Sequence, residues 1–132
     1  MELQNLADRA VMAKETALAL YSGFPVGAAL LTESGKIYTG CNIESSSFGL
    51  TMCAERVALY KALSEGERFF KAIAIAANVD NYCPPCGACR QVLWDFAKDV
   101  MVVLVNSIGA QETHQLSELL PHAFDDGFLS NG

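Results

Sequence analysis

Basic residues are few in this sequence, and they do not cluster. The 132 residues include 9 Lys and Arg against 15 Asp and Glu, which gives a net charge of −6. Binding to a nucleic-acid backbone needs a concentrated basic surface, so no polynucleotide partner is expected. The longest apolar runs, such as residues 100–105, are also far shorter than the roughly 20 residues that span a bilayer. We therefore expect no membrane partner.

Histidine is scarce, with 2 residues, and the 5 cysteines are odd in number. Five thiols cannot all pair, and the N-terminus lacks the basic start and apolar stretch of a signal peptide. These features favour a reducing cytoplasm. The sequence also lacks internal repeats, low-complexity tracts and linkers, so we expect a single domain over residues 1–132.

Apolar periodicity predicts a mixture of helices and strands. Apolar residues recur every three or four positions from Leu3 to Leu20, which is typical of an amphipathic helix that Ser22–Pro25 ends. Two short β-type runs then predict a hairpin. The predicted strands are 26–32, 37–41, 72–77, 100–105 and, at the edge of the sheet, 112–115; further helices are predicted over 52–64, from near Cys86 to Ala97 and over 116–120. This order predicts an α/β fold with a mixed sheet covered by helices, whose strand-to-helix loops carry the site.

Three thiols lie within the nine-residue stretch Cys83-Pro84-Pro85-Cys86-Gly87-Ala88-Cys89-Arg90-Gln91. Cys86 and Cys89 share one helix face at a spacing of three. Unpaired N–H groups at a helix start favour the thiolate form, which binds zinc. Taken alone, this pair fits a thioredoxin-like redox site equally well.

The candidates for a third metal ligand are Cys41, Cys53, Cys83, His114 and His122. Cys53 is the best placed, because it opens a predicted helix and Glu55 follows two residues later. Residues two apart can share a centre only beyond the helix N-terminus. Two helix N-termini that meet at one ion would give three thiolates and one open position, as in a catalytic zinc site.

Cys83 precedes two prolines, whose stiff backbone should direct its side chain away from the ion. We interpret Cys83 and Cys41 as small apolar residues.

The segments around these ligands resemble the small homotetrameric cytidine deaminases. The resemblance is carried by Thr51-Met52-Cys53-Ala54-Glu55-Arg56 and by Pro85-Cys86-Gly87-Ala88-Cys89-Arg90-Gln91, and residues 21–30, 40–44 and 118–121 extend it in family order. It implies a three-layer cytidine-deaminase-like fold with a mixed five-stranded sheet. It also implies a homotetramer and one Zn²⁺ per chain, held by Cys53, Cys86 and Cys89.

The implied reaction is hydrolytic deamination of cytidine, and of deoxycytidine, to the uracil nucleoside and ammonia in pyrimidine salvage. Zinc would lower the pKa of a water molecule towards roughly 7. The counterpart of Glu55 in the family passes a proton from this water to the adjacent ring nitrogen, and then delivers another proton to the departing amine. Apolar surroundings would keep the pKa of Glu55 from being fixed low, as both roles require.

The resemblance also assigns substrate contacts. Phe24 is similar to the ring that packs against the base. Asn42 and Glu44 are similar to the pair that binds the ribose hydroxyl groups. The Ala54 backbone N–H corresponds to a donor to the base carbonyl. Phe124 resembles an aromatic residue that reaches into a neighbouring subunit's site. Because a carboxylate that binds sugar hydroxyls would repel a phosphate, we expect a free nucleoside substrate.

Three thiolates leave a zinc site with a net charge of −1, which weakens the metal as a Lewis acid. Arg56 and Arg90 each follow a site residue directly, so we expect both to donate hydrogen bonds to sulfur. Phe48 and Ser45-Ser46 stand where relatives often carry Tyr and Asn-Ala, which concerns subunit contacts and not the reaction.

Three alternatives stay open at this stage. The first is deamination of another aminopyrimidine nucleoside, such as a nucleoside antibiotic. The second is a structural zinc module, which would leave Glu55 unexplained. The third is a redox protein.

Overall fold

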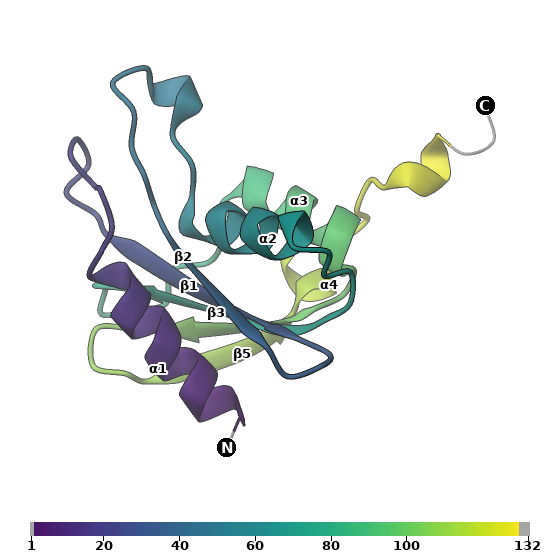
Figure 1. Cartoon of the computed structure of the whole chain (residues 1–132), viewed down its shortest axis with the longest axis horizontal. Helices are drawn as coiled ribbons and strands as arrows, with labels where there is room; N and C mark the ends of the chain where they lie inside the picture. Colours follow the sequence, from purple (N-terminus) through teal and green to yellow (C-terminus); the bar gives the residue numbers. More distant parts are fainter. Residues whose placement is uncertain (1, 130–132) are drawn as a thin grey trace.

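A mixed five-stranded sheet forms the centre of the structure, a computed structural model that describes residues 2–129 (Figure 1). The strands are β1 (Val26–Thr32), β2 (Ile37–Cys41), β3 (Phe70–Ala77), β4 (Met101–Val105) and β5 (Gln111–Gln115). Their order across the sheet is β2-β1-β3-β4-β5. The central pair β3–β4 is parallel and the other neighbouring pairs are antiparallel. The predicted mixed sheet is thus confirmed.

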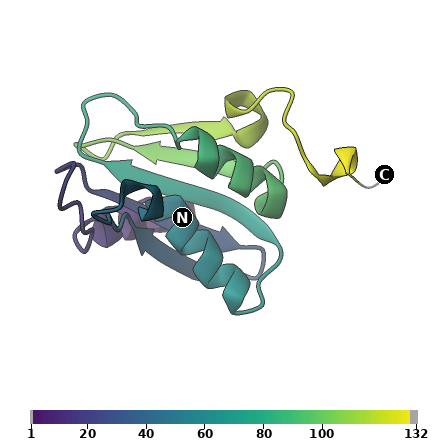
Figure 2. The same cartoon turned by 90° about the horizontal axis from the view of Figure 1, so that it is seen from above.

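Helices cover both faces of this sheet. Helix α1 (Glu2–Lys14) lies on one face, and α2 (Ala54–Ser64) and α3 (Gly87–Ala97) lie on the other, as Figures 1 and 2 show from two directions. The short helix α4 (Leu116–Leu119) packs beside α3, and two 3₁₀ turns, Phe48–Leu50 and Asp126–Phe128, complete the order. The three-layer α/β architecture is therefore also confirmed. Within residues 2–129, no helix combines the length and apolar character needed to cross a bilayer.

Strand β3 is buried on both faces because each face receives a helical layer. Its small residues Ala72, Ala74 and Ala76 pack on the α1 side, while Ile73 and Ile75 pack on the α2 and α3 side. The alternation of small and large residues lets α1 lie close to the sheet and gives the opposite face the larger apolar core.

The first helix is shorter than the apolar pattern predicts. It ends at Lys14, and Leu20 lies 70% exposed beyond it. The backbone around Leu18 instead pairs with residues 42–44: Leu18 N donates to Asn42 O at 2.9 Å, and Glu44 N donates to Leu18 O at 3.0 Å. Tertiary hydrogen bonding thus replaces the last predicted turns of the helix, which corrects that prediction.

Candidate active site

The N-termini of α2 and α3 meet on one side of the sheet. Cys53 is the N-cap residue of α2, Cys86 is the N-cap residue of α3, and Cys89 lies in the first turn of α3. The first turns of α2 pack closely against β2, because a Cβ atom added at Gly40 would lie 2.5 Å from Ala54 O. A side chain at position 40 would therefore displace this ligand-bearing helix from the sheet.

Three sulfur atoms form one cluster at this junction. The Sγ atoms of Cys53 and Cys86 are 3.6 Å apart, those of Cys86 and Cys89 are 3.3 Å apart, and all three lie within 4.8 Å of one another. Thiolates at about 2.3 Å from a tetrahedral zinc ion would lie roughly 3.8 Å apart. All five cysteines are free thiols. The donor set therefore fits one Zn²⁺ per chain, held by three thiolates with one position open.

Arg56 supports the negative charge of this cluster, as predicted. Its Nη2 atom lies 3.5 Å from Cys53 Sγ. The hydrogen bond from the Cys89 thiol, together with the Arg56 guanidinium, lowers the pKa of Cys53 to about 5. Cys53 is thus poised to act as a thiolate.

Arg90 behaves differently from the prediction, because its hydrogen bond is not with sulfur. Its Nη1 atom donates to Leu119 O, at the end of α4, at 2.7 Å. Carbonyl groups in the last turn of a helix lack helical partners, which makes Leu119 O a ready acceptor. The Nε atoms of Arg56 and Arg90 are buried, and neither has a hydrogen-bond partner within residues 2–129.

Glu55 lies in the first turn of α2, beside the sulfur cluster, and is only 4% exposed. Burial raises the pKa of its carboxyl group to about 7. A carboxyl group with this pKa can both accept and release a proton near neutral pH, as a general base that later acts as an acid requires.

A cleft of about 260 Å³ joins Glu55 and the sulfur cluster to the predicted substrate-binding residues. Its lining comprises Ser22, Phe24, Val26, Asn42, Glu44, Thr51, Cys53, Ala54, Glu55, Ile75, Cys83, Pro84 and Cys86. The fold therefore brings Phe24, Asn42, Glu44 and Ala54 into the same cleft as the cysteines, although they come from separate segments of the chain.

Hydrogen bonds tie two polar cleft residues to residues 21–26, which lead into β1 and include its first residue. Asn42 Oδ1 accepts from Val26 N, and Asn42 Nδ2 donates to Phe24 O, both at 2.9 Å. Glu44 accepts from the backbone N–H groups of Tyr21 and Ser22, each at 2.9 Å. The hydrogen bonds from Ser22 hold the pKa of Glu44 below its usual value, so Glu44 is ionised.

The sequence reasoning did not single out Ser22 or expect Cys83 in the cleft wall. Cys83 Sγ lies 3.7 Å from Pro84 O, and it stays outside the three-sulfur cluster, as the two following prolines predict. Burial raises the pKa of the Cys83 thiol. The place of Ser22 within the matching block 21–30 was the available signal for its importance.

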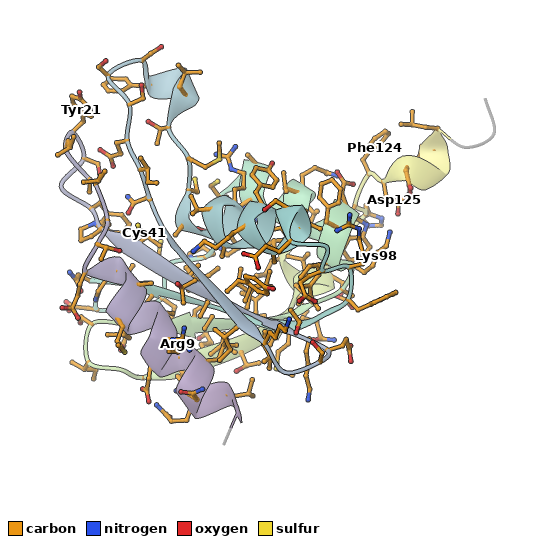
Figure 3. All side chains as sticks on the ribbon, viewed as in Figure 1. Arg9, Tyr21, Cys41, Lys98, Phe124 and Asp125 are labelled. Atoms are coloured by element: carbon orange, nitrogen blue, oxygen red, sulfur yellow. The ribbon has the colours of Figure 1, made fainter. Side chains whose placement is uncertain are left out.

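Phe124 lies outside the cleft of its own chain. Its ring stacks on Phe128 with centroids 5.4 Å apart, and its carbonyl oxygen accepts from Gln91 Nε2 at 2.8 Å. In Figure 3, Phe124 and Tyr21, whose backbone holds Glu44, lie on opposite sides of the molecule. Phe124 therefore does not line the cleft that contains Glu55 in its own chain.

A three-cysteine metal site with a buried glutamate beside it, on this fold, defines the class of zinc-dependent deaminases. The sequence profile of the cytidine and deoxycytidylate deaminase zinc-binding region matches residues 1–105. The chain belongs to this family.

Similar proteins match this chain over almost its whole length. A cytidine deaminase from Sporosarcina psychrophila is 48% identical, over 98% of this chain and 96% of the relative. One from Halalkalibacterium halodurans is 50% identical, over 94% and 95% respectively. The crystal structure of cytidine deaminase from Burkholderia pseudomallei superposes with a TM-score of 0.91 at 46% identity, over 94% of this chain and 100% of that one.

Proposed function

We propose that this chain is a cytidine deaminase, which hydrolyses cytidine, and deoxycytidine, to uridine or deoxyuridine and ammonia in pyrimidine salvage. The observation that carries this proposal is the buried carboxyl group of Glu55 beside the three-sulfur cluster, in a cleft that also contains Asn42 and Glu44. A structural zinc module needs no protonatable carboxyl group in a cleft. A dithiol redox site needs no third sulfur.

Cys53, Cys86 and Cys89 would hold the zinc ion. Bound there, zinc would lower the pKa of a water molecule to about 7 and so would supply a nucleophile at neutral pH. Glu55 takes a proton from the water that attacks the amino-bearing carbon and passes it to the adjacent ring nitrogen. Glu55 then takes the second proton and gives it to the amino group, which leaves as ammonia.

The other cleft residues bind the nucleoside. The ring of Phe24, 37% exposed in the cleft wall, packs against the base, and the Ala54 N–H donates to the base carbonyl. Glu44 accepts from a sugar hydroxyl, and Asn42 keeps one amide hydrogen beyond its two backbone contacts. A carboxylate in the sugar region disfavours a phosphate nearby, so the substrate is a nucleoside and not a nucleotide.

We further propose that residues 1–132 form one deaminase domain that assembles as a homotetramer, with Phe124 entering the cleft of a neighbouring subunit. Exposed apolar side chains in three segments of the chain support such an assembly: Leu18, Leu20 and Tyr21, then Phe48 and Leu50, and then Phe124, Phe128 and Leu129. The five free thiols support a reducing compartment such as the cytoplasm.

The direct test is to incubate the purified zinc-loaded protein with cytidine and to follow ammonia release and uridine formation. We expect stoichiometric ammonia and uridine, and no turnover after the zinc is removed. A zinc-loaded protein that converts a different aminopyrimidine nucleoside but not cytidine would contradict the substrate assignment. A zinc-loaded protein without any deaminase activity would contradict the enzymatic function.

A further inference from the structure

We propose that Ser22 is a positioning residue that fixes the carboxylate of Glu44 for sugar binding, an inference that rests on the proposed function. Ser22 lies in the segment before β1, at the edge of the cleft, and Glu44 lies in the loop after β2. Ser22 uses both its backbone and its side chain to hold Glu44.

The hydrogen bonds leave Glu44 little freedom. Its Oε1 atom accepts from Tyr21 N and Ser22 N, each at 2.9 Å, and its Oε2 atom accepts from the Ser22 hydroxyl group. A carboxylate offers two acceptor positions on each oxygen, so Oε1 is fully used and Oε2 keeps one. The carboxylate therefore presents a single acceptor position to a sugar hydroxyl, and the Ser22 hydroxyl determines which one.

A second contact directs the Ser22 hydroxyl hydrogen. Ser22 Oγ accepts from Phe24 N at 3.0 Å. A backbone N–H can only donate, so the hydroxyl acts as the acceptor there and its own hydrogen is available for Glu44 Oε2. Gly23, between the two residues, has φ +65°, a conformation that glycine adopts without strain and that closes this tight turn.

The segment does not depend on the Ser22 hydroxyl for its position. Asn42 holds Phe24 O and Val26 N independently, and Gly23 N donates to Ala19 O at 3.0 Å. Ser22 is also exposed, so the loss of its hydroxyl creates no cavity in the core. Removing the hydroxyl should therefore free one oxygen of Glu44 without unfolding the loop, and the effect should appear in substrate binding.

The test compares the steady-state kinetics of Ser22→Ala with those of wild-type protein. Hydrogen bonds to charged groups are among the stronger ones, and two backbone donors remain, so we expect KM for cytidine to rise about tenfold. We expect kcat to stay within about threefold, because the reacting groups are untouched. Ser22→Thr keeps the hydroxyl and should restore KM to within about twofold of wild type. Ser46→Ala, in an exposed part of the 42–51 loop, is the matched control and should change neither constant.

Two further measurements separate positioning from a general structural role. First, 2′,3′-dideoxycytidine lacks both hydroxyl groups that Glu44 could bind, so Ser22→Ala should leave its KM unchanged. Second, in a Glu44→Ala background, Ser22→Ala should add less than about twofold to KM for cytidine, because no carboxylate remains to be positioned.

Several outcomes would overturn the inference. They are an unchanged KM for cytidine in Ser22→Ala, an equal rise for the dideoxynucleoside, a full additional rise in the Glu44→Ala background, and loss of zinc or of cooperative melting in Ser22→Ala. The last outcome would assign the hydroxyl to folding. If wild-type protein itself does not deaminate cytidine, the proposed function fails. If wild type is active and Ser22→Ala behaves like it, only the role of Ser22 fails.

Discussion

Glu55 is buried and lies in the cleft beside three thiols, and we propose that it carries protons in two steps of the reaction. In Glu55→Gln the side chain keeps its size but cannot accept a proton. General acid–base catalysis contributes about 10²–10⁴-fold, so we expect kcat to fall by about 10⁴-fold or more. Zinc content and cytidine binding should be retained, because the thiols and the sugar-binding residues are unchanged.

The measurement is ammonia release by zinc-loaded protein, with metal content and melting temperature recorded on the same samples. Glu65→Gln, at the exposed opposite end of α2, is the control and should keep wild-type activity. If folded, zinc-loaded Glu55→Gln protein releases ammonia at a rate within tenfold of wild type, Glu55 has a structural role and not a catalytic one.

The metal ligands can be distinguished from the fourth nearby cysteine. Cys83 lies in the cleft wall but outside the sulfur cluster. We expect Cys83→Ala to keep one zinc ion per chain. Cys53→Ala should lose most of its zinc, because only two thiolate ligands remain in that variant. Metal analysis after dialysis against a weak chelator provides the comparison. Equal zinc losses in the two variants would show that the ligand assignment is wrong.

The sequence predicts those contacts of the site that a local spacing of residues marks, and it does not predict contacts between distant segments that no such spacing marks. The group formed by Cys53, Cys86 and Cys89 follows from short spacings at two helix starts, and the structure brings the three sulfur atoms together. The partner of Arg90 is Leu119, 29 positions away, and no local pattern indicates it. The contact between Ser22 and Glu44 likewise joins distant segments, so the local pattern around Ser22 does not indicate it.

At the scale of elements, α2, which carries Cys53 at its N-cap and Glu55 in its first turn, packs closely against β2 at Gly40. A Cβ atom at Gly40 would lie 2.5 Å from Ala54 O and 2.6 Å from Ala58 N, both backbone atoms that cannot rotate away. We expect Gly40→Ala to destabilise the fold by about 3 kcal/mol and to lower the melting temperature by roughly 10 °C. Zinc affinity should fall as well, because α2 must move away from the sheet together with Cys53.

Gly49→Ala is the matched control, since a Cβ atom there meets nothing within 4 Å. Thermal melting and zinc titration of the two variants test the prediction. A Gly40→Ala protein with the melting temperature and zinc affinity of Gly49→Ala would show that α2 does not depend on this contact.

Element boundaries could be predicted where side-chain pattern and tertiary structure agree. The hairpin strands β1 and β2 were predicted with their observed bounds, because turn residues and short β-type runs delimit them. The first helix was predicted too long. The regular spacing of apolar residues continues past Lys14, where the helix ends. The backbone near Leu18 instead pairs with the 42–44 segment. The spacing of apolar residues within one segment does not reveal such pairing with a distant segment.

At the scale of the whole molecule, the proposed assembly makes a specific prediction about Phe124. Light scattering should report a homotetramer at micromolar concentration, and an active monomer would contradict this proposal. Phe124→Ala should impair cytidine turnover. When mixed with Glu55→Gln protein and allowed to exchange subunits, it should regain part of that activity. Sites with an intact Glu55 would then receive Phe124 from the other variant, whereas a role of Phe124 within its own chain predicts no recovery.

The separation of the metal ligands along the chain has a consequence for biosynthesis. Cys53 and Cys86 are 33 positions apart, with α2 and all of β3 between them. A ribosome-bound chain that has emerged only as far as β3 carries a single member of the ligand set. Zinc loading must therefore wait until α3 has emerged, and until then the nascent chain exposes unprotected thiols. Protection of the thiols from oxidation is thus needed before α3 emerges, and metal supply is needed only after it.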